Sequence, residues 1–115
     1  MRNRINDIRL NEFFTLREFQ SPDTCQVMIY PELLEKLTAL RAALGVPVRI
    51  FSGYRTKEHN EAVGGVKNSR HLVGKAADIG VPKLEVKRCM ELLPSLGFQY
   101  FYYDTPRDYF HVQVE

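Results

Sequence analysis

The chain has 115 residues, 44% of them hydrophobic, and a formal net charge of +2 at pH 7. That length supplies one modest hydrophobic core, so we expect residues 1–115 to form a single domain. Acidic and basic residues are interspersed, and no basic stripe with interleaved aromatic residues indicates a nucleic acid partner. The N-terminus lacks the apolar run that a signal peptide or a membrane span needs. We therefore expect synthesis in the cytoplasm without a signal peptide, no transmembrane segment, and export only by another route.

The first third of the chain predicts helices after a loosely ordered N-terminal segment, which we place at residues 1–12. Residues 15–18, Thr-Leu-Arg-Glu, have capping-box spacing and predict a short helix. Residues 31–44 predict a longer helix, because Pro31 lies in its first turn and Gly45 follows its end. Leucines recur along it at helical spacing and predict its core-facing side: Leu33, Leu37, Leu40 and Leu44.

The middle of the chain mixes strand and helix signals. Residues 48–51, Val-Arg-Ile-Phe, alternate as a half-buried strand does. Thr56 is suited to cap a short helix that Gly64 and Gly65 would end. Residues 82–93 predict a further helix with apolar residues on one side.

The last part of the chain predicts a β-hairpin. Residues 98–103 and 109–114 are aromatic, β-prone runs, and the turn-like residues 104–107 separate them. Helices come first and strands are concentrated later, rather than in a repeating βαβ pattern. The pattern therefore favours an α+β fold, with a small antiparallel sheet and helices packed on it.

Two histidines and an aspartate stand out as chemistry-bearing residues. His71, Asp78 and His111 together offer two imidazoles and one carboxylate, the protein donors of a catalytic zinc site that keeps a fourth position open. Asp78 lies among apolar neighbours, where a carboxylate costs several kcal/mol unless it is paired or binds a metal. His111 lies in a β-prone run whose apolar neighbours point to the other face. Both residues are therefore candidate metal ligands.

The stretch around His71 resembles a known family. Residues 69–78 fit the signature Ser-x-His-x-x-Gly-x-Ala-x-Asp at every specified position. Residues 52–56 with His59 and Asn60, and residues 110–112 near the end, resemble the segments that flank this signature. The sequence is thus similar, over about residues 13–114, to the zinc D-Ala-D-Ala carboxypeptidase and L-alanyl-D-glutamate peptidase family, in particular to its small, phage-endolysin-like members.

The resemblance implies a fold of the Hedgehog and D-Ala-D-Ala-peptidase type and a role for each site residue. It implies that His71, Asp78 and His111 bind Zn²⁺. Asp108 would be the general base, and Arg55 would steady the carbonyl oxygen as it becomes an oxyanion. Residues three apart in a regular strand point to opposite faces, so Asp108 must lie in the turn before the strand.

The sequence also predicts roles for residues around the three candidate ligands. Ser69 would hydrogen-bond the substrate or orient the ligand loop, and Gln113 could line the cleft because it shares a strand face with His111. We do not expect His59 to be a fourth ligand. Cys25 and Cys89 are expected to be ordinary reduced residues, with a single disulfide or a metal role as the alternatives.

The expected function is zinc-dependent hydrolysis of an amide bond in a peptidoglycan stem peptide, of the D-Ala-D-Ala or L-Ala-D-Glu type, by a monomer. One alternative is a non-catalytic zinc-containing module that binds a wall peptide or a protein. Another is an iron oxygenase, which uses the same donor set. The sequence does not identify which bond is cleaved. It also does not distinguish a prophage lysin that reaches the wall after release from a recycling enzyme.

Overall fold

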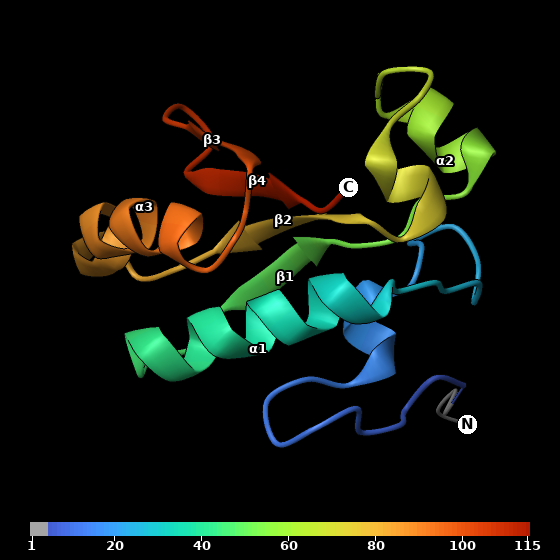
Figure 1. Cartoon of the computed structure of the whole chain (residues 1–115). Helices are drawn as coiled ribbons and strands as arrows, with labels where there is room; N and C mark the ends of the chain where they lie inside the picture. The colour runs from blue at the N-terminus through green and yellow to red at the C-terminus, as the bar shows by residue number, and fades with distance from the viewer. Residues whose placement is uncertain (1–4) are drawn as a thin grey trace.

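The computed structural model of the chain describes residues 5–115, and Figure 1 shows three α-helices around one sheet. In chain order the elements are the 3-10 turn η1 (Leu16–Phe19), helix α1 (Pro31–Leu44), strand β1 (Arg49–Ser52), helix α2 (Lys57–Ala62), turn η2 (Arg70–Val73), strand β2 (Ala76–Gly80), turn η3 (Lys83–Glu85), helix α3 (Val86–Ser95), strand β3 (Tyr100–Asp104) and strand β4 (Tyr109–Gln113).

The four strands form one antiparallel sheet in the order β1-β2-β4-β3. Strands β3 and β4 are the hairpin that the sequence predicts, and the α+β class is confirmed. The register places Asp78 of β2 directly opposite His111 of β4, and His111 directly opposite Tyr102 of β3. Three side chains from three strands therefore form one row across the sheet.

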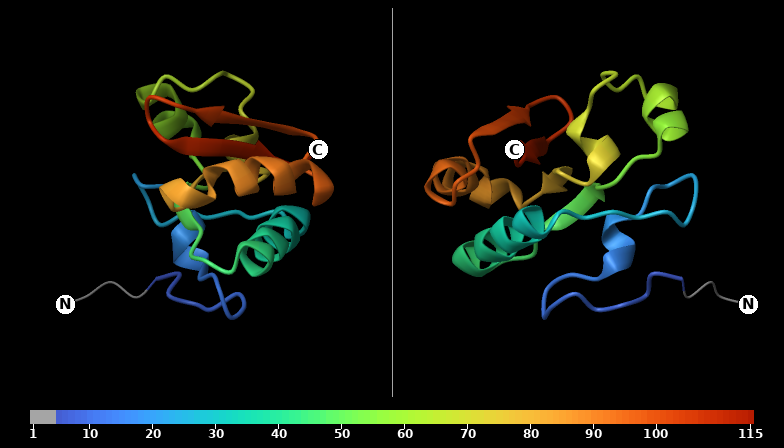
Figure 2. Two further views of the ribbon diagram at one scale, coloured as in Figure 1. Left: turned by 90° about the vertical axis from the view of Figure 1, so that its left-hand side faces the viewer. Right: turned by 45° about the vertical axis from the view of Figure 1, so that its right-hand side comes forward.

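The two longer helices cover one face of the sheet. The row of Asp78, His111 and Tyr102 lies on the opposite face. Helices α1 and α3 lie on the same side of the strands (Figure 2). Because side chains alternate along a strand, the apolar residues of β2 and β4 point toward these helices. The buried core includes Ala77, Ile79, Phe110 and Val112 from the sheet, and Leu33, Leu37, Leu40, Leu44, Cys89 and Leu93 from the helices. Asp78 and His111 therefore lie on the face away from α1 and α3.

Several predicted elements agree closely with the structure. Helix α1 has the predicted bounds, and Gly45 ends it in the left-handed conformation with φ of 69°. The Thr56 side chain caps α2 by accepting from the His59 N–H at 3.1 Å. The predicted helix 82–93 is instead divided into η3 and α3, and α3 continues to Ser95 with Pro94 inside it.

The beginning of the described chain is tied to the body of the protein. The Leu16 N–H donates to the Ile8 carbonyl at 2.8 Å, and Asn6 Nδ2 donates to the Cys25 carbonyl at 2.6 Å. These hydrogen bonds connect Ile8 and Asn6, within the segment that the sequence predicts to be loosely ordered, to residues later in the chain. Residues 1–4 of that segment lie outside the described residues.

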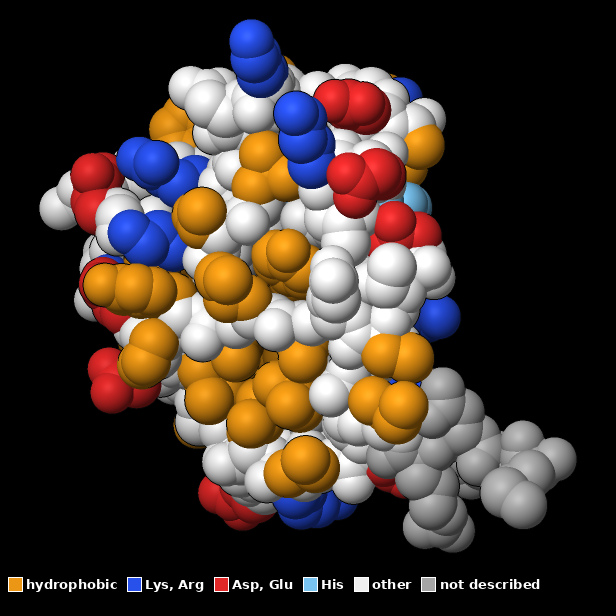
Figure 3. Space-filling model, turned by 90° about the vertical axis from the view of Figure 1, so that its right-hand side faces the viewer, with side chains coloured by type: hydrophobic (Ala, Val, Ile, Leu, Met, Phe, Trp, Pro, Cys, Tyr) orange, Lys and Arg blue, Asp and Glu red, His pale blue; other side chains and the backbone are white. Residues whose placement is uncertain are grey.

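The surface carries apolar as well as charged side chains. The face shown in Figure 3 has a central group of hydrophobic side chains with charged ones around it. Met28, Tyr30 and Val73 are exposed, and the Tyr30 N–H donates to the Gly74 carbonyl at 2.8 Å. Apolar side chains therefore reach solvent where the segment before α1 meets η2. None of the helices within residues 5–115 has the length and apolar character needed to cross a bilayer.

Candidate metal centre and its cleft

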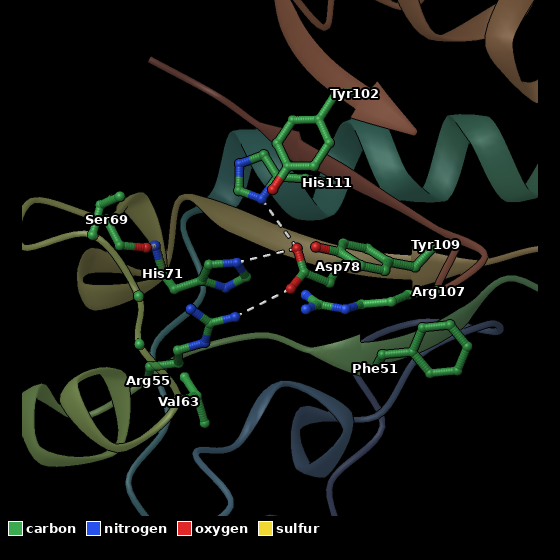
Figure 4. Close-up of a pocket in the computed structure, with 13 residues that line it drawn as sticks. Phe51, Arg55, Val63, Ser69, His71, Asp78, Tyr102, Arg107, Tyr109 and His111 are labelled. Carbon is green, nitrogen blue, oxygen red and sulfur yellow. Dashed lines mark hydrogen bonds and ion pairs between the residues drawn. The ribbon is translucent and has the colours of Figure 1, made fainter. Parts of the chain in front are cut away.

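His71, Asp78 and His111 converge from three different elements, as Figure 4 shows. His71 lies in η2, Asp78 in β2 and His111 in β4. Asp78 Oδ1 lies 3.3 Å from His71 Nε2 and 3.0 Å from His111 Nδ1. One ligand atom from each residue can be chosen so that all three lie within 4.8 Å of one another. The three predicted ligands therefore form one cluster.

The turn between His71 and Asp78 depends on Gly74. Ser69 caps η2 by accepting from the His71 N–H, and Gly74 ends η2 with φ of 72°. A Cβ atom at Gly74 would lie 2.6 Å from the Met28 carbonyl oxygen, so a larger residue would clash with the backbone there. Glycine adopts this conformation readily, and the chain returns as β2 so that Asp78 faces His71.

Each imidazole has an acceptor at the ring nitrogen that points away from the cluster. His71 Nδ1 donates to the Gly53 carbonyl at 2.6 Å, and His111 Nε2 donates to Gln113 Oε1 at 2.9 Å. These acceptors select the tautomers in which His71 Nε2 and His111 Nδ1 carry lone pairs directed at the cluster. Two imidazole lone pairs and a carboxylate oxygen then meet at one point, which is the donor arrangement that a zinc ion requires.

The second oxygen of Asp78 binds a guanidinium group. Arg55 Nη2 donates to Asp78 Oδ2 at 3.1 Å, while Arg55 Nε donates to Ser52 and Nη1 to Asn60. Burial raises the pKa of Asp78, but without a metal the hydrogen bonds that His111 and His71 donate when their facing nitrogens carry a proton outweigh burial and hold that pKa well below its ordinary value. Asp78 is therefore ionised near neutral pH, the form in which a carboxylate binds a cation.

The cluster lies at the bottom of a cleft of about 610 Å³. Its walls include two arginines, Arg55 and Arg107, and the aromatic residues Phe51, Tyr102 and Tyr109. Past His111 the cleft continues into a second hollow of about 340 Å³, lined partly by Arg70 and Gln113. A substrate in this cleft could therefore extend on both sides of the cluster.

The comparison with known proteins now decides the family. A family model described as peptidase M15 matches residues 8–113, almost the whole chain. The chain belongs to the peptidase M15 family. The predicted family is thereby confirmed, while the likeness to its phage-endolysin-like members stays a prediction.

This M15 family member also has a curated relative with a local match. It is 48% identical over 46 residues to a zinc D-Ala-D-Ala carboxypeptidase from Streptomyces albus G. The match covers 39% of this chain and only 18% of the relative's length. Zinc, named for that relative, is also the metal that the His71, Asp78 and His111 donor set fits.

The structure of the M15 domain does not bring Asp108 into the cleft. Asp108 precedes β4, in the turn where the strand argument requires it, and has φ of 56°. Its carboxylate accepts a hydrogen bond from the Tyr103 hydroxyl and lies 3.8 Å from Lys83 Nζ. The residues on either side of it, Arg107 and Tyr109, do line the cleft. The predicted base thus lies beside the cleft with its side chain directed elsewhere.

Ser69 and Gln113, the other predicted site residues of this M15 domain, both contact a predicted metal ligand. Ser69 lines the cleft and accepts from the His71 backbone, so it orients the turn that carries the first ligand. Gln113 binds the outer nitrogen of His111 and lines only the second hollow. Cys25 and Cys89 form no disulfide within residues 5–115.

Two parts of the M15 site were not expected from the sequence. The Tyr102 ring stacks on His111, with ring centroids 5.0 Å apart and an angle of 12° between the planes. Burial, and then a hydrogen bond with Tyr109, raise the pKa of the Tyr102 hydroxyl, which therefore stays protonated. Strand alternation together with the hairpin register could have placed Tyr102 opposite His111. No comparable signal marks Arg107, because it lies in a turn.

Proposed function

We propose that this protein is a zinc metallopeptidase that hydrolyses an amide bond in a peptidoglycan stem peptide. The observation that carries the proposal is the convergence of His71, Asp78 and His111 with their lone pairs directed at one point. A cleft that extends on both sides of this point supports a peptide substrate. The family and the name of the Streptomyces relative support the reaction and the substrate class.

The residues of the cleft can be assigned complementary tasks. When bound by the two histidines and Asp78, zinc supplies Lewis-acid polarisation of a carbonyl and a water molecule with a pKa near neutrality. Arg55 makes three hydrogen bonds with protein acceptors, and its guanidinium has five N–H donors. Two N–H groups remain for the oxygen that gains negative charge during hydrolysis. Arg55 is therefore suited both to hold Asp78 and to stabilise the oxyanion.

We assign the proton transfer to Asp108, because the family resemblance implies this role for it. As general base, its carboxylate would take a proton from the attacking water and later donate it to the leaving amine. To do so it must turn from Tyr103 into the cleft, which its neighbours Arg107 and Tyr109 already line. Its side chain is 42% exposed, so this rotation breaks only the Tyr103 hydrogen bond and the long ion pair with Lys83.

The experiment is digestion of purified peptidoglycan by the zinc-loaded protein, followed by mass spectrometry of the released peptides. We expect new peptide termini at one type of amide bond, and none after treatment with a chelator or with His71→Ala. Restoring zinc to the chelated wild-type protein should restore the products. Intact peptidoglycan in the presence of correctly folded, zinc-loaded protein would overturn the proposal.

A second candidate is a non-catalytic zinc-containing module that binds wall peptides. The observation that favours it is the Asp108 side chain, which contacts Tyr103 and Lys83 rather than the cleft. The same digestion separates the two candidates when the protein is also sedimented with peptidoglycan. Binding without products would support the module, whereas released peptides would support the peptidase.

A further inference from the structure

We propose that Arg107 binds a carboxylate of the substrate and thereby determines which peptides the cleft accepts. This inference rests on the proposed peptidase function and adds a specificity residue that lies outside the metal cluster. Arg107 lies at the tip of the β3–β4 hairpin and lines the same cleft as the metal ligands. Figure 4 shows its side chain extending toward the cluster.

The two arginines of the main cleft differ in their partners. Arg55 is committed to Ser52, Asn60 and Asp78, and its side chain is only 14% exposed. The Arg107 guanidinium, in contrast, makes no hydrogen bond and no ion pair with any residue in the range 5–115. Arg107 is therefore the cation of this cleft whose full charge and donor fork are available to a ligand.

The backbone of the hairpin fixes where Arg107 can reach. The Arg107 N–H donates to Asp104 Oδ1 at 3.0 Å, and the Asp108 N–H donates to the Asp104 carbonyl at 2.8 Å. These bonds hold the base of the side chain at the rim of the cleft. Phe51 and Tyr109, which line the same cleft, provide apolar walls beside the guanidinium. Apolar side chains beside the guanidinium lower the local dielectric constant and so strengthen an ion pair formed there.

A carboxylate is the ligand that best fits these features. An arginine fork binds a carboxylate through two parallel hydrogen bonds, which gives both affinity and orientation. Peptides of the proposed substrate class carry a terminal carboxylate and the free carboxylate of a glutamyl residue, and either could be the ligand. The first would favour release of a terminal residue, and the second would favour cleavage within the peptide. Both ligands are carboxylates, so the experiment must use matched substrates that differ in one of them.

The test compares matched peptides that differ in one carboxylate. One pair has a free C-terminal carboxylate or its amide, and the other pair has D-glutamate or D-isoglutamine at the glutamyl position. With the zinc-loaded wild-type protein, we expect kcat/KM to fall on amidation in one pair and to change little in the other. The pair that responds identifies which carboxylate Arg107 binds.

The variant Arg107→Ala should remove this preference. For the responsive acidic peptide we expect kcat/KM to fall about tenfold to a hundredfold, as expected for the loss of one charge-assisted contact, mainly through a higher KM. The amidated partner should be cleaved as before, and Arg107→Lys should retain part of the preference. Arg9→Ala is the matched control, because Arg9 is an exposed arginine that lines neither hollow.

The outcomes separate this inference from the proposed function. Equal losses on acidic and amidated peptides with Arg107→Ala, or the same loss on the acidic peptide with Arg9→Ala, would overturn the role of Arg107 while leaving the peptidase intact. Cleavage of no peptide by the wild-type protein would overturn the proposed function instead. Calorimetric titration of the acidic and amidated peptides into the metal-free protein gives a second readout. There, Arg107→Ala should weaken binding of the acidic peptide alone.

Discussion

Arg55 and Asp78 are joined by a hydrogen bond of 3.1 Å between Nη2 and Oδ2, which leaves Asp78 Oδ1 to face the two imidazoles. One carboxylate oxygen of Asp78 thus contacts the Arg55 guanidinium, and the other faces the two predicted histidine ligands. Removal of either partner from a buried ion pair leaves an uncompensated charge. The orientation of Asp78 therefore depends on Arg55 as well as on its own strand.

Replacement of Arg55 should weaken zinc binding. We expect Arg55→Lys and Arg55→Ala to raise the dissociation constant for zinc about tenfold to a hundredfold, because partners of a metal ligand tune its orientation. Titration of zinc against a fluorescent chelator measures this constant directly. Arg9→Ala, which alters an exposed arginine that lines neither hollow, is the control and should leave the constant unchanged. An unaltered zinc affinity in both Arg55 variants would contradict the positioning role.

Replacement of Asp108 should separate metal binding from turnover. Asp108→Ala should bind zinc nearly as the wild-type protein does, because Asp108 is not among the three clustered ligands. Its kcat should fall about a hundredfold or more, which is the usual contribution of a general base. Peptide cleavage assays check this, with the exposed α1 residue Glu35→Ala as a remote carboxylate control. Wild-type turnover in Asp108→Ala would remove the base assignment.

Two glycines with similar backbone conformations should respond differently to alanine. Gly74 and Gly45 have φ of 72° and 69°, but a Cβ at Gly74 meets the Met28 backbone while one at Gly45 meets nothing within 4 Å. Gly45→Ala should cost about 1–2 kcal/mol of unfolding free energy, the strain of a left-handed residue. Gly74→Ala should cost more, and should also weaken zinc binding because it displaces the turn between His71 and Asp78. Urea unfolding measures the stabilities, and equal losses would show that the Met28 contact is unimportant.

The stabilising effect of Cys89 should decrease at alkaline pH. Cys89 is fully buried in the core, and burial raises the pKa of its thiol to about 12. In the unfolded chain the thiol ionises near pH 8.5, so the unfolded state loses a proton that the native state keeps. The contribution of Cys89 is complete below about pH 8.5 and is lost as pH rises toward 12, by up to about 1.4 kcal/mol per pH unit.

The comparison of wild-type and Cys89→Ala proteins isolates this effect. The difference between their unfolding free energies in urea should become smaller from pH 8 to pH 10, because all other titrating groups are common to both. The buried thiol should also resist alkylation by iodoacetamide at pH 8 until the protein unfolds. A stability difference that is independent of pH would contradict the burial of a neutral thiol.

Local patterns in the sequence were sufficient to predict α1, β1 and the β3–β4 hairpin. The leucine spacing and the flanking Pro31 and Gly45 set both ends of α1, because the packing of one helix face and the two end residues agree. His71 and Asp78 could be predicted from one short signature because they lie only seven residues apart, whereas His111 lies outside it and was predicted from its place in a β-prone run. The turn η2 was not predicted, because a single 3-10 turn has no periodic pattern.

The directions of side chains in turns could not be predicted. Strand alternation required only that Asp108 lie before β4, and its left-handed backbone then directs the carboxylate to Tyr103. Arg107, the residue before it, instead points into the cleft. Such differences between neighbours depend on turn geometry and tertiary contacts, which a linear pattern does not contain.

The account depends most on one divalent cation bound jointly by His71, Asp78 and His111. The most direct measurement is an anomalous difference map, recorded on both sides of the zinc absorption edge, from crystals of the zinc-loaded protein. We predict a single strong peak at about 2.0–2.2 Å from His71 Nε2, His111 Nδ1 and an oxygen of Asp78. A peak bound by other residues, or zinc-loaded crystals with no peak among these three side chains, would contradict the account.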